Sequence, residues 1–445
     1  MNRLSGLDPS QLTATAVAQG IAAGTFSSEE IAAALIARIA AIDGEIQAFA
    51  HVDPEVVLAE ARARDAWKSM GGRLGPLHGV PVGIKDLFDT ADYPTEYGSP
   101  IFAGHRPSAD AAAVRRLREA GAVVIGKTVT TEFAYYAPGK TRNPHDTART
   151  PGGSSSGSAA AVAAGLAPLA LGSQTNGSVI RPASFCGVHG VKPSHGLVSR
   201  AGALMLSRKL DHVGAFARSL DDLALALDVL VGQDAADPDS RPYAAPGFGA
   251  ALRSAWPLPP RLAFVRTPVW DRADADARSA IEALARDLHA EEVELPAGFA
   301  GAWDAHRAIM AVDMAHNLGH HADRGPVSQQ FAELIAEGRR ITAVQYLAAR
   351  RDAERYAEGL SGVFEQVADA IITLPAVGAA PQGLEATGDP AFCSLWSLVG
   401  CPALSLPLLT SSDDMPVGVQ LIGQFNRDER LFRTAKHVLS RLGRN

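Results

Sequence analysis

The sequence predicts a large α/β fold, and three observations support this prediction. The chain has 445 residues, which at about 150 residues each suggests about three domains, although single α/β domains also reach this size. Its composition is 47% apolar and 20% charged, which is typical of globular enzymes and excludes an intrinsically disordered chain. Residues 110–120 have a helical pattern and lead through Gly121 into the apolar run 122–126, a helix-to-strand step typical of α/β proteins.

The N-terminal part is predicted to be helical. Ser27 and Glu30 form a capping-box pattern ahead of apolar residues at helical spacing. A second helix is expected after Asp53, with Pro54 in its first turn. These signals predict a helical arm over about residues 8–68. Further along the chain, the pattern predicts helices at 219–232, 276–290 and within 300–350, strands at 168–171, 371–375, 403–407 and 417–422, and a surface excursion at 232–248.

Charge and cysteine content limit the class and compartment of the protein. Lys and Arg number 41 and Asp and Glu number 48, so the formal net charge of −7 disfavours a nucleic-acid binder. The three cysteines, Cys186, Cys393 and Cys401, give no disulfide framework and favour a reducing compartment. No secretory signal is evident, and the longest nearly apolar run, Ala159–Gly172, is shorter than the ~20 residues that span a bilayer. We therefore expect a cytoplasmic protein with neither a nucleic-acid nor a membrane partner.

The segment Pro151–Gly190 carries the strongest chemical signal. Its Gly/Ser run, Gly152–Ser158, allows tight turns and close backbone approach, and leads directly into an alanine-rich stretch that should form a helix. The loop Gln174–Pro182 contains Ser178, and its Gly and Asn residues can turn successive N–H groups toward one point, as an oxyanion hole requires. Upstream, Lys85 lies in an apolar run, where burial would remove its charge and make it a base.

Each of these features has another explanation when it is considered alone. A Gly/Ser run can be a linker or a phosphate-binding loop, but the P-loop pattern ends in Gly-Lys-Ser/Thr and this run continues as Gly157–Ala159. Ser178 alone could be a turn serine, and Lys85 alone a surface lysine whose stem packs on apolar neighbours. Spacing and composition by themselves therefore leave a Ser/Lys nucleophile site as one of several interpretations.

Taken together, these separated segments resemble the amidase signature family in order and spacing. The resemblance spans roughly residues 10–440 and is weakest over 235–370. It is carried by the Lys85 segment, Asn143–Pro144, the run Gly152–Ser158, the loop Gln174–Pro182, Phe185–Val188 and Gly400–Ala403. It implies a three-layer α/β/α fold around a large mixed, mostly parallel sheet. It also implies one amidase-type domain over 1–445, with the helical arm at about 8–68 and a variable, cleft-covering helical region at about 300–350.

The resemblance further implies a Ser–cis-Ser–Lys triad. By position, Ser178 is the nucleophile, Ser154 the bridging serine and Lys85 the terminal base. The family carries the bridging serine on a cis peptide bond, which here is Gly153–Ser154. Neither a metal nor an organic cofactor is implied. The implied oxyanion hole consists of the main-chain N–H groups of Thr175, Asn176, Gly177 and Ser178.

Two departures from the family pattern affect the surroundings of the triad. Many members have Asp-x-Gly-Gly-Ser before the nucleophile, whereas this chain has Gln174 and Asn176 in that stretch. Many members also have arginine two residues after the nucleophile, whereas here that position is Ile180 and Arg181 follows it. The electrostatics beside the triad and the subgroup are therefore open.

Other constellations remain ambiguous in the sequence. His316, His320 and His321, with His306 nearby, could bind zinc, but we favour histidines on a helix surface because no glutamate lies at zinc-protease spacing. Four aromatic residues are candidates for the substrate pocket and are equally compatible with the core. They are Tyr135, Tyr136, Phe392 and Trp396.

The predicted function is hydrolysis of a carboxylic amide on a small-molecule substrate through a serine acyl-enzyme, with esters and carbamates as further substrates of the same chemistry. One alternative is an amidotransferase A-type subunit that delivers ammonia to a partner. A second is a catalytically silent scaffold with the same fold. The helical arm makes a homodimer a further expectation.

Overall fold

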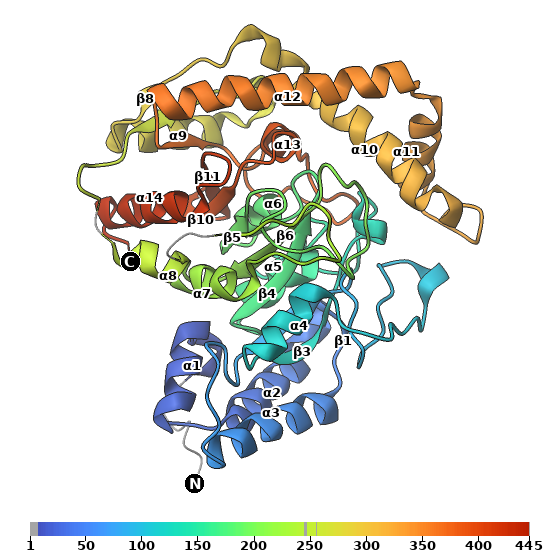
Figure 1. The fold of residues 1–445 in the computed structure, drawn as a ribbon, viewed down its shortest axis with the longest axis vertical. Coiled ribbons are helices and arrows are strands. Elements are labelled where there is room, and N and C mark those ends of the chain that lie inside the picture. The colour runs from blue at the N-terminus through green and yellow to red at the C-terminus, as the bar shows by residue number, and fades with distance from the viewer. Residues whose placement is uncertain (1–7, 244–246, 255, 445) are drawn as a thin grey trace.

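The computed structural model describes residues 8–243, 247–254 and 256–444, and one sheet of eleven strands forms its centre (Figure 1). The strand order is β1-β3-β2-β4-β6-β5-β10-β11-β9-β7-β8. The strands are β1 (Phe49–His51), β2 (Pro81–Lys85), β3 (Val123–Thr128), β4 (Leu169–Gln174), β5 (His189–Lys192), β6 (His212–Ala217), β7 (Leu262–Phe264), β8 (Glu291–Glu292), β9 (Ala370–Thr373), β10 (Ala403–Thr410) and β11 (Pro416–Ile422).

The sheet is mixed, and its parallel pairs lie in two groups. Strands β3, β2 and β4 run parallel to one another, as do β9, β7 and β8. The other six neighbouring pairs that the described residues form are antiparallel. The predicted α/β/α class around a large mixed sheet is confirmed, and the share of parallel pairs is smaller than the sequence led us to expect.

Helices cover the sheet and extend beyond it in two groups (Figure 1). Helices α1–α3 form the blue group near the N-terminus, and α10–α12 form the orange group at the opposite end of the view. The helices are α1 (Ala14–Ala23), α2 (Ser28–Ile46), α3 (Pro54–Ser69), α4 (Ala112–Glu119), α5 (Ser156–Ala163), α6 (Ile180–Phe185), α7 (Leu220–Leu230), α8 (Phe248–Arg253), α9 (Ala275–Asp287), α10 (Ala302–Leu318), α11 (Gln329–Arg340), α12 (Ala343–Gln366), α13 (Ala391–Leu398) and α14 (Asp428–Arg441).

Local sequence signals explain where the N-terminal helices begin. The Ser27 hydroxyl accepts from the Glu30 N–H at 3.0 Å, and the Glu30 carboxylate accepts from the Ser27 N–H at 2.8 Å. The predicted capping box is therefore confirmed at the start of α2. Helix α3 begins at Pro54, and Asp53 caps it, also as predicted. The predicted surface excursion at 232–248 lies partly outside the described residues.

Small residues allow α5 to pack directly on its surroundings. A Cβ atom added at Gly157 would lie 2.1 Å from the carbonyl oxygen of Ala48 and 2.3 Å from the main-chain nitrogen of Val129. No side chain fits there without moving the backbone, so glycine is required for this close approach. The predicted alanine-rich helix is confirmed as α5, which is buried from Ser156 to Val162 and contacts β2, β3 and β4.

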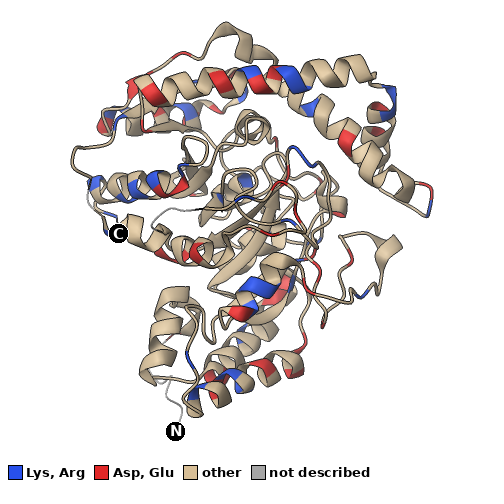
Figure 2. Cartoon of the chain, in the orientation of Figure 1, with Lys and Arg blue, Asp and Glu red and all other residues tan. Residues whose placement is uncertain are grey.

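Charged residues concentrate on the outer helices (Figure 2). Acidic and basic residues are interspersed along α12, and α14 carries two acidic residues in its first turn and basic residues along the rest, whereas α13 carries no charged residue. None of the described helices is both long enough and apolar enough to span a membrane. The apolar interior therefore lies around the central strands and the short helices α5, α6 and α13.

Candidate active site

Lys85 ends β2 in a fully buried position. Its Nζ donates to the Ser154 hydroxyl at 2.7 Å and to the Ser173 hydroxyl at 2.8 Å. Burial lowers the pKa of Lys85 well below its usual value, and the Asp211 carboxylate partly opposes this effect. An ammonium group that contacts neutral hydroxyls can release its proton far more easily than one that is paired with a carboxylate.

Ser154 lies in the loop that leads into α5. The Gly153–Ser154 peptide bond is cis, as the resemblance implies. The Gly153 carbonyl accepts from Arg181 Nη2 at 2.7 Å, and the Ser154 carbonyl accepts from the Thr131 N–H at 3.2 Å. These two bonds fix the main chain on both sides of the Ser154 side chain.

Ser178 lies in the loop that joins β4 to α6. The N–H of Ser155 donates to the Ser178 carbonyl at 3.4 Å, so the two serine-bearing loops are in direct contact. Ser154 and Ser178 are both largely buried, with 3% and 8% of their surfaces exposed. The structure therefore brings the predicted nucleophile loop beside the Lys85–Ser154 pair from a separate segment of the chain.

Gln174 organises the nucleophile loop, a role that the sequence did not reveal. Its side-chain carbonyl accepts from the N–H groups of Val179 and Ile180 at 2.8 and 2.9 Å. Its amide nitrogen donates to the Ser397 hydroxyl on α13 at 3.1 Å. The only signal in the sequence was that many family members have an acid at this position. The structure shows that a neutral amide makes these contacts here.

Asn176 anchors the same loop to α13. The Ser394 hydroxyl donates to the Asn176 side-chain oxygen at 2.7 Å, and the Ser397 hydroxyl donates to the Asn176 main-chain carbonyl at 2.5 Å. No hydrogen bond within the described part of the chain uses the N–H of Asn176, Gly177 or Ser178. These donors are therefore available to an oxyanion beside Ser178.

The histidines predicted on a helix surface occupy different environments. His316 and His320 are exposed, but His321 is buried and stacks on Phe133 with ring centroids 5.8 Å apart, so the surface prediction is wrong for His321. Helical spacing places residues on a face but does not say what packs against that face. Across the described residues, no cluster of three or more His, Cys, Asp or Glu is arranged to hold a metal ion.

His306 is also buried, and it contacts the nucleophile loop from α10. Its Nε2 lies 3.0 Å from the Thr175 carbonyl oxygen, which requires a donating Nε2–H. Burial lowers the pKa of His306 to about 4, so the ring is neutral near pH 7. This histidine positions the loop, a role that its spacing from His316 could not indicate.

The four predicted pocket residues fall into two pairs. Tyr135 and Tyr136 stack with ring centroids 4.3 Å apart, and the Tyr136 hydroxyl accepts from Asn176 Nδ2 at 3.4 Å. Phe392 and Trp396 lie on α13 and are fully buried. Tyr136 therefore borders the nucleophile loop directly and Tyr135 stacks on Tyr136, whereas the two α13 residues occupy core positions.

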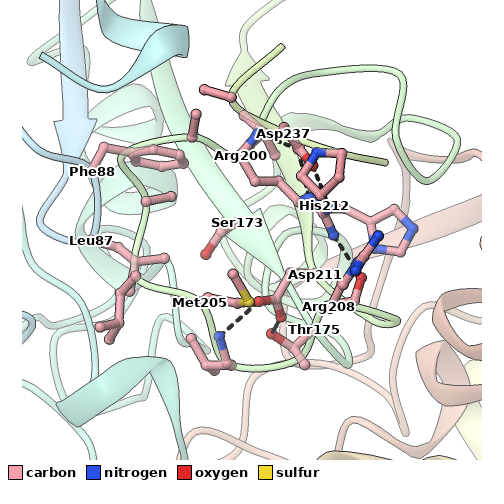
Figure 3. A pocket seen from close by; sticks show the side chains of 17 residues that line it. Leu87, Phe88, Ser173, Thr175, Arg200, Met205, Arg208, Asp211, His212 and Asp237 are labelled. Carbon is pink, nitrogen blue, oxygen red and sulfur yellow. Dashed lines mark hydrogen bonds and ion pairs between the residues drawn. The ribbon is translucent and has the colours of Figure 1, made fainter. Parts of the chain in front are cut away.

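A cavity of about 80 Å³ adjoins the base end of the site (Figure 3). Ser173, the second partner of Lys85, faces into it together with Asp211. Asp211 accepts from the Thr175 hydroxyl at 2.7 Å, and burial raises the pKa of Asp211 to about 6. Most of the remaining wall is apolar, including Leu87, Phe88, Ala203, Leu204, Met205 and Val213. This apolar lining contributes to the environment that disfavours charge near Lys85.

Known proteins are similar to this chain over nearly its whole length. The family model described as Amidase matches residues 30–432. The A-type subunit of the glutamyl-tRNA(Gln) amidotransferase from Chloroflexus aggregans is 38% identical, over 93% of this chain and 93% of its own length.

Solved structures are also similar to this chain over nearly its whole length. The native peptide amidase from Stenotrophomonas maltophilia is 31% identical with a TM-score of 0.84, over 98% of each chain. A protein from a vestigial complex related to the origins of an s-triazine catabolic enzyme is 33% identical with a TM-score of 0.89, over 97% of this chain and 99% of its own. The family and these neighbours support an amide hydrolase. The sequence motifs, the fold and these comparisons together show that the chain belongs to the amidase signature family.

Proposed function

We propose that the protein hydrolyses a carboxylic amide through a serine acyl-enzyme, with Ser178 as nucleophile, Ser154 as proton bridge and Lys85 as base. The observation that carries this proposal is the 2.7 Å contact between Lys85 Nζ and the Ser154 hydroxyl in a fully buried setting. Burial that lowers the pKa of Lys85 supplies the neutral amine that a base requires.

The chemical steps follow from these roles. Neutral Lys85 accepts the Ser154 hydroxyl proton while Ser154 takes the proton of Ser178. The Ser178 oxygen bonds to the amide carbon, and the carbonyl electron pair moves onto its oxygen. When the C–N bond breaks, its electron pair leaves with nitrogen, which receives the proton back through Ser154. Water then attacks the Ser178 ester in the same way, which releases the acid and restores the serine hydroxyl.

The oxyanion would bind the main-chain N–H groups of Thr175, Asn176, Gly177 and Ser178. Such preorganised donors are worth about 10²–10³-fold in rate for each one removed in comparable enzymes. The contacts of Gln174 and Asn176 with α13 would hold these donors in place.

The substrate pocket would include Tyr135 and Tyr136, because Tyr136 contacts the nucleophile loop through Asn176. Phe392 and Trp396 would shape the pocket indirectly, by fixing the position of α13. The helices at 302–366 would cover the cleft, since His306 on α10 reaches the Thr175 carbonyl.

The test is covalent labelling together with turnover of a panel of aryl, alkyl and dipeptide amides. Wild-type protein should react with a fluorophosphonate at Ser178, and Ser178→Ala should lose both labelling and essentially all turnover. Ser361→Ala, at an exposed position on α12, is the matched control and should keep both. Turnover at the wild-type rate by a well-folded Ser178→Ala protein would exclude Ser178 as the nucleophile.

An amidotransferase A-type subunit is the main alternative, and the similarity to such a subunit of a glutamyl-tRNA(Gln) amidotransferase favours considering it. A protein of this kind would hydrolyse glutamine efficiently only with its partner subunits. Full activity of the purified chain on simple amides would support the amidase. A catalytically silent scaffold would neither label nor turn over.

We further propose that the enzyme works in the cytoplasm on small-molecule amides and forms a homodimer. The cytoplasmic assignment rests on the cysteines, since Cys186, Cys393 and Cys401 are all free and buried. The helical arm would supply the dimer contact. Light scattering after gel filtration tests the dimer, and a monomer at micromolar concentration would contradict it.

A further inference from the structure

A surface groove lies where α8 and α14 pack against each other. It has a volume of about 420 Å³ and is lined by residues from the end of α8, from the segment that follows α8 and from α14. The two helices come from distant parts of the sequence, so the fold and not a local motif builds this groove. We call it the α8–α14 groove. It shares no lining residue with the cavity beside Lys85, so it is separate from the candidate active site.

The α8–α14 groove is positively charged. Its lining includes the cations Arg253, Arg433 and Lys436, and no Asp or Glu among the described residues lines it. None of these three side chains forms an ion pair or a hydrogen bond with another described residue, whereas the neighbouring Arg430 pairs with the Asp369 carboxylate. The groove therefore holds three cations that receive no counter-charge from the described part of the chain.

The ends of the two helices do not account for this charge. The negative end of a helix dipole favours a cation in the last turn, and Arg253 occupies that position in α8. Arg433 and Lys436 precede the last turn of α14, whose basic residue is Arg441. The whole chain has a formal net charge of −7, so on average it repels anions. The groove is thus a local site of opposite sign, and Figure 2 shows the basic residues along α14 that contribute to it.

Trp256 holds the Arg433 side chain in place. The guanidinium carbon of Arg433 lies 4.0 Å from the centroid of the Trp256 ring, within the range of a cation–π contact. Arg430 contacts the same ring at 5.4 Å. Arg433 Nε and Trp256 Nε1 are buried and have no hydrogen-bond partner among the described residues. A guanidinium fixed in this way presents its N–H donors as a rigid fork, which loses little conformational freedom when it binds an anion.

We propose that the α8–α14 groove binds a phosphorylated small molecule through its phosphate groups. The Arg433 fork would bind two phosphate oxygens, and Arg253 and Lys436 would supply further positive charge. A phosphate group carries a charge of about −1.5 to −2 and three acceptor oxygens, which matches several cations better than the single charge of a carboxylate. The volume of the groove lies within the range of about 300–1,000 Å³ that is typical of small-molecule sites, so there is also room for an organic part. This inference does not depend on the proposed amide hydrolysis.

The test is calorimetry of the full chain with pyrophosphate at about 0.15 M salt. We expect the wild type to bind pyrophosphate with a Kd below about 1 mM, and its unfolding temperature to rise by about 2 °C or more at saturation. Arg433→Gln should weaken binding at least about tenfold, because the charge-assisted hydrogen bonds of the fork are lost. Arg433→Lys should retain part of the affinity, because lysine keeps the charge but lacks the fork.

Arg351→Gln is the matched control, because Arg351 is an exposed cation on α12 that does not line the groove. It should bind pyrophosphate as the wild type does. Lys436→Gln is a second groove variant and should weaken binding about threefold or more, so the proposal stays testable if Arg433→Gln fails to fold. Ser178→Ala should bind pyrophosphate like the wild type, and the groove variants should keep amide turnover, which separates this inference from the proposed function.

Three results would overturn the proposal. The first is the absence of pyrophosphate binding to the wild type at about 10 mM. The second is an equal loss of affinity in Arg433→Gln and Arg351→Gln, which would indicate diffuse attraction to the protein surface and not a site. The third is tighter binding of a hexaglutamate peptide than of pyrophosphate, which would assign the groove to an acidic segment of a partner protein.

Discussion

Two buried lysines on adjacent strands meet very different surroundings. Lys85 ends β2, and Lys127 lies on the parallel strand β3 in register with Ile84. Since side chains alternate along a strand, the two ammonium groups point to opposite faces of the sheet. Both side chains are fully buried. Any difference between them therefore comes from their partners and not from their exposure.

The partners differ in charge. Lys85 Nζ contacts two neutral serine hydroxyls. Lys127 pairs with the Asp86 carboxylate at 3.2 Å. Lys127 also donates to the carbonyl oxygens of Phe88 and Pro94 and to the hydroxyls of Thr90 and Thr95.

The pKa of each lysine reflects these partners. Burial lowers both pKa values, that of Lys85 well below the usual value, and Asp86 opposes the shift at Lys127. A buried lysine among neutral partners is suited to be a base, whereas a buried lysine facing a carboxylate is suited to hold a loop. Lys127 holds the residues 86–95 that follow the Lys85 strand.

The largest expected effect comes from Lys85→Met. Methionine preserves the length and apolar character of the stem but cannot accept a proton. We expect kcat/KM to fall by at least about 10³-fold, within the range of a positioned acid–base group. The variant should unfold near pH 7 at a temperature no lower than that of wild type, since it removes a group whose pKa burial lowers and leaves no buried charge without a partner. A Lys85→Met protein with activity within tenfold of wild type would contradict the assignment of the two lysines.

Lys127→Met should have the opposite profile. It leaves the buried Asp86 carboxylate without a counter-charge, which costs about 3–5 kcal/mol in comparable sites. We expect this loss in the free energy of unfolding measured by denaturant titration. The folded fraction, counted by fluorophosphonate labelling, should keep activity within about tenfold of wild type.

The double variant Lys127→Met, Asp86→Asn is the control for this experiment. It removes the carboxylate together with the lysine and should recover part of the lost stability, because the buried charge has gone. A double variant no more stable than Lys127→Met would mean that the pair does not act through charge.

The sequence predicted those parts of the site and fold that are encoded in short, continuous stretches of the chain. The Lys85 segment, the Gly/Ser run and the Ser178 loop were recognisable because each motif is contiguous, and the structure brings Lys85 and Ser154 into contact. The capping box at Ser27 was found for the same reason. Each of these features depends on residues that are close together in the sequence.

Partners distant in the sequence could not be found in this way. Ser173 meets Lys85 across 88 residues, and His306 meets the Thr175 carbonyl across 131 residues. No spacing rule links such positions, because strand order in the sheet decides which segments meet. Strands β7 and β8 have only three and two residues, too few to show a period.

The pH dependence of activity should separate the two lysines further. Lys85 acts only when neutral, so kcat/KM should fall as pH drops through its lowered pKa, approaching about tenfold per pH unit below it. Lys85→Met should remove this acid limb, and Lys127→Arg should keep it. Burial raises the pKa of Asp211 to about 6, so titration of Asp211 would also produce a loss of activity at low pH. Asp211→Asn is the control, and it should keep an acid limb if that limb belongs to Lys85.

Stability should respond to pH with a defined sign. The pKa of Lys85 is lower in the folded protein than in the unfolded chain, so between the two values the unfolded state binds more protons. The free energy of unfolding should therefore rise with pH across that interval. Lys85→Met should show a shallower rise, and an identical slope in both proteins would contradict the lowered pKa.

Ser173→Ala should give the smallest effect and the finest test of the comparison. It removes one of the two hydroxyls that contact Lys85 Nζ and leaves Ser154, so the proposed proton path stays intact. The loss of one hydrogen bond is worth about 0.5–1.5 kcal/mol, which predicts a decrease in kcat/KM of at most about tenfold. The ammonium form also loses an acceptor, so the pKa of Lys85 should fall further and the acid limb should move to lower pH. Ser173→Thr keeps the hydroxyl and should leave the limb in place. If the acid limb moved to higher pH in Ser173→Ala, Ser173 would favour the neutral amine of Lys85. The Asp86 carboxylate beside Lys127 would then be the one remaining cause of the difference between the two lysines.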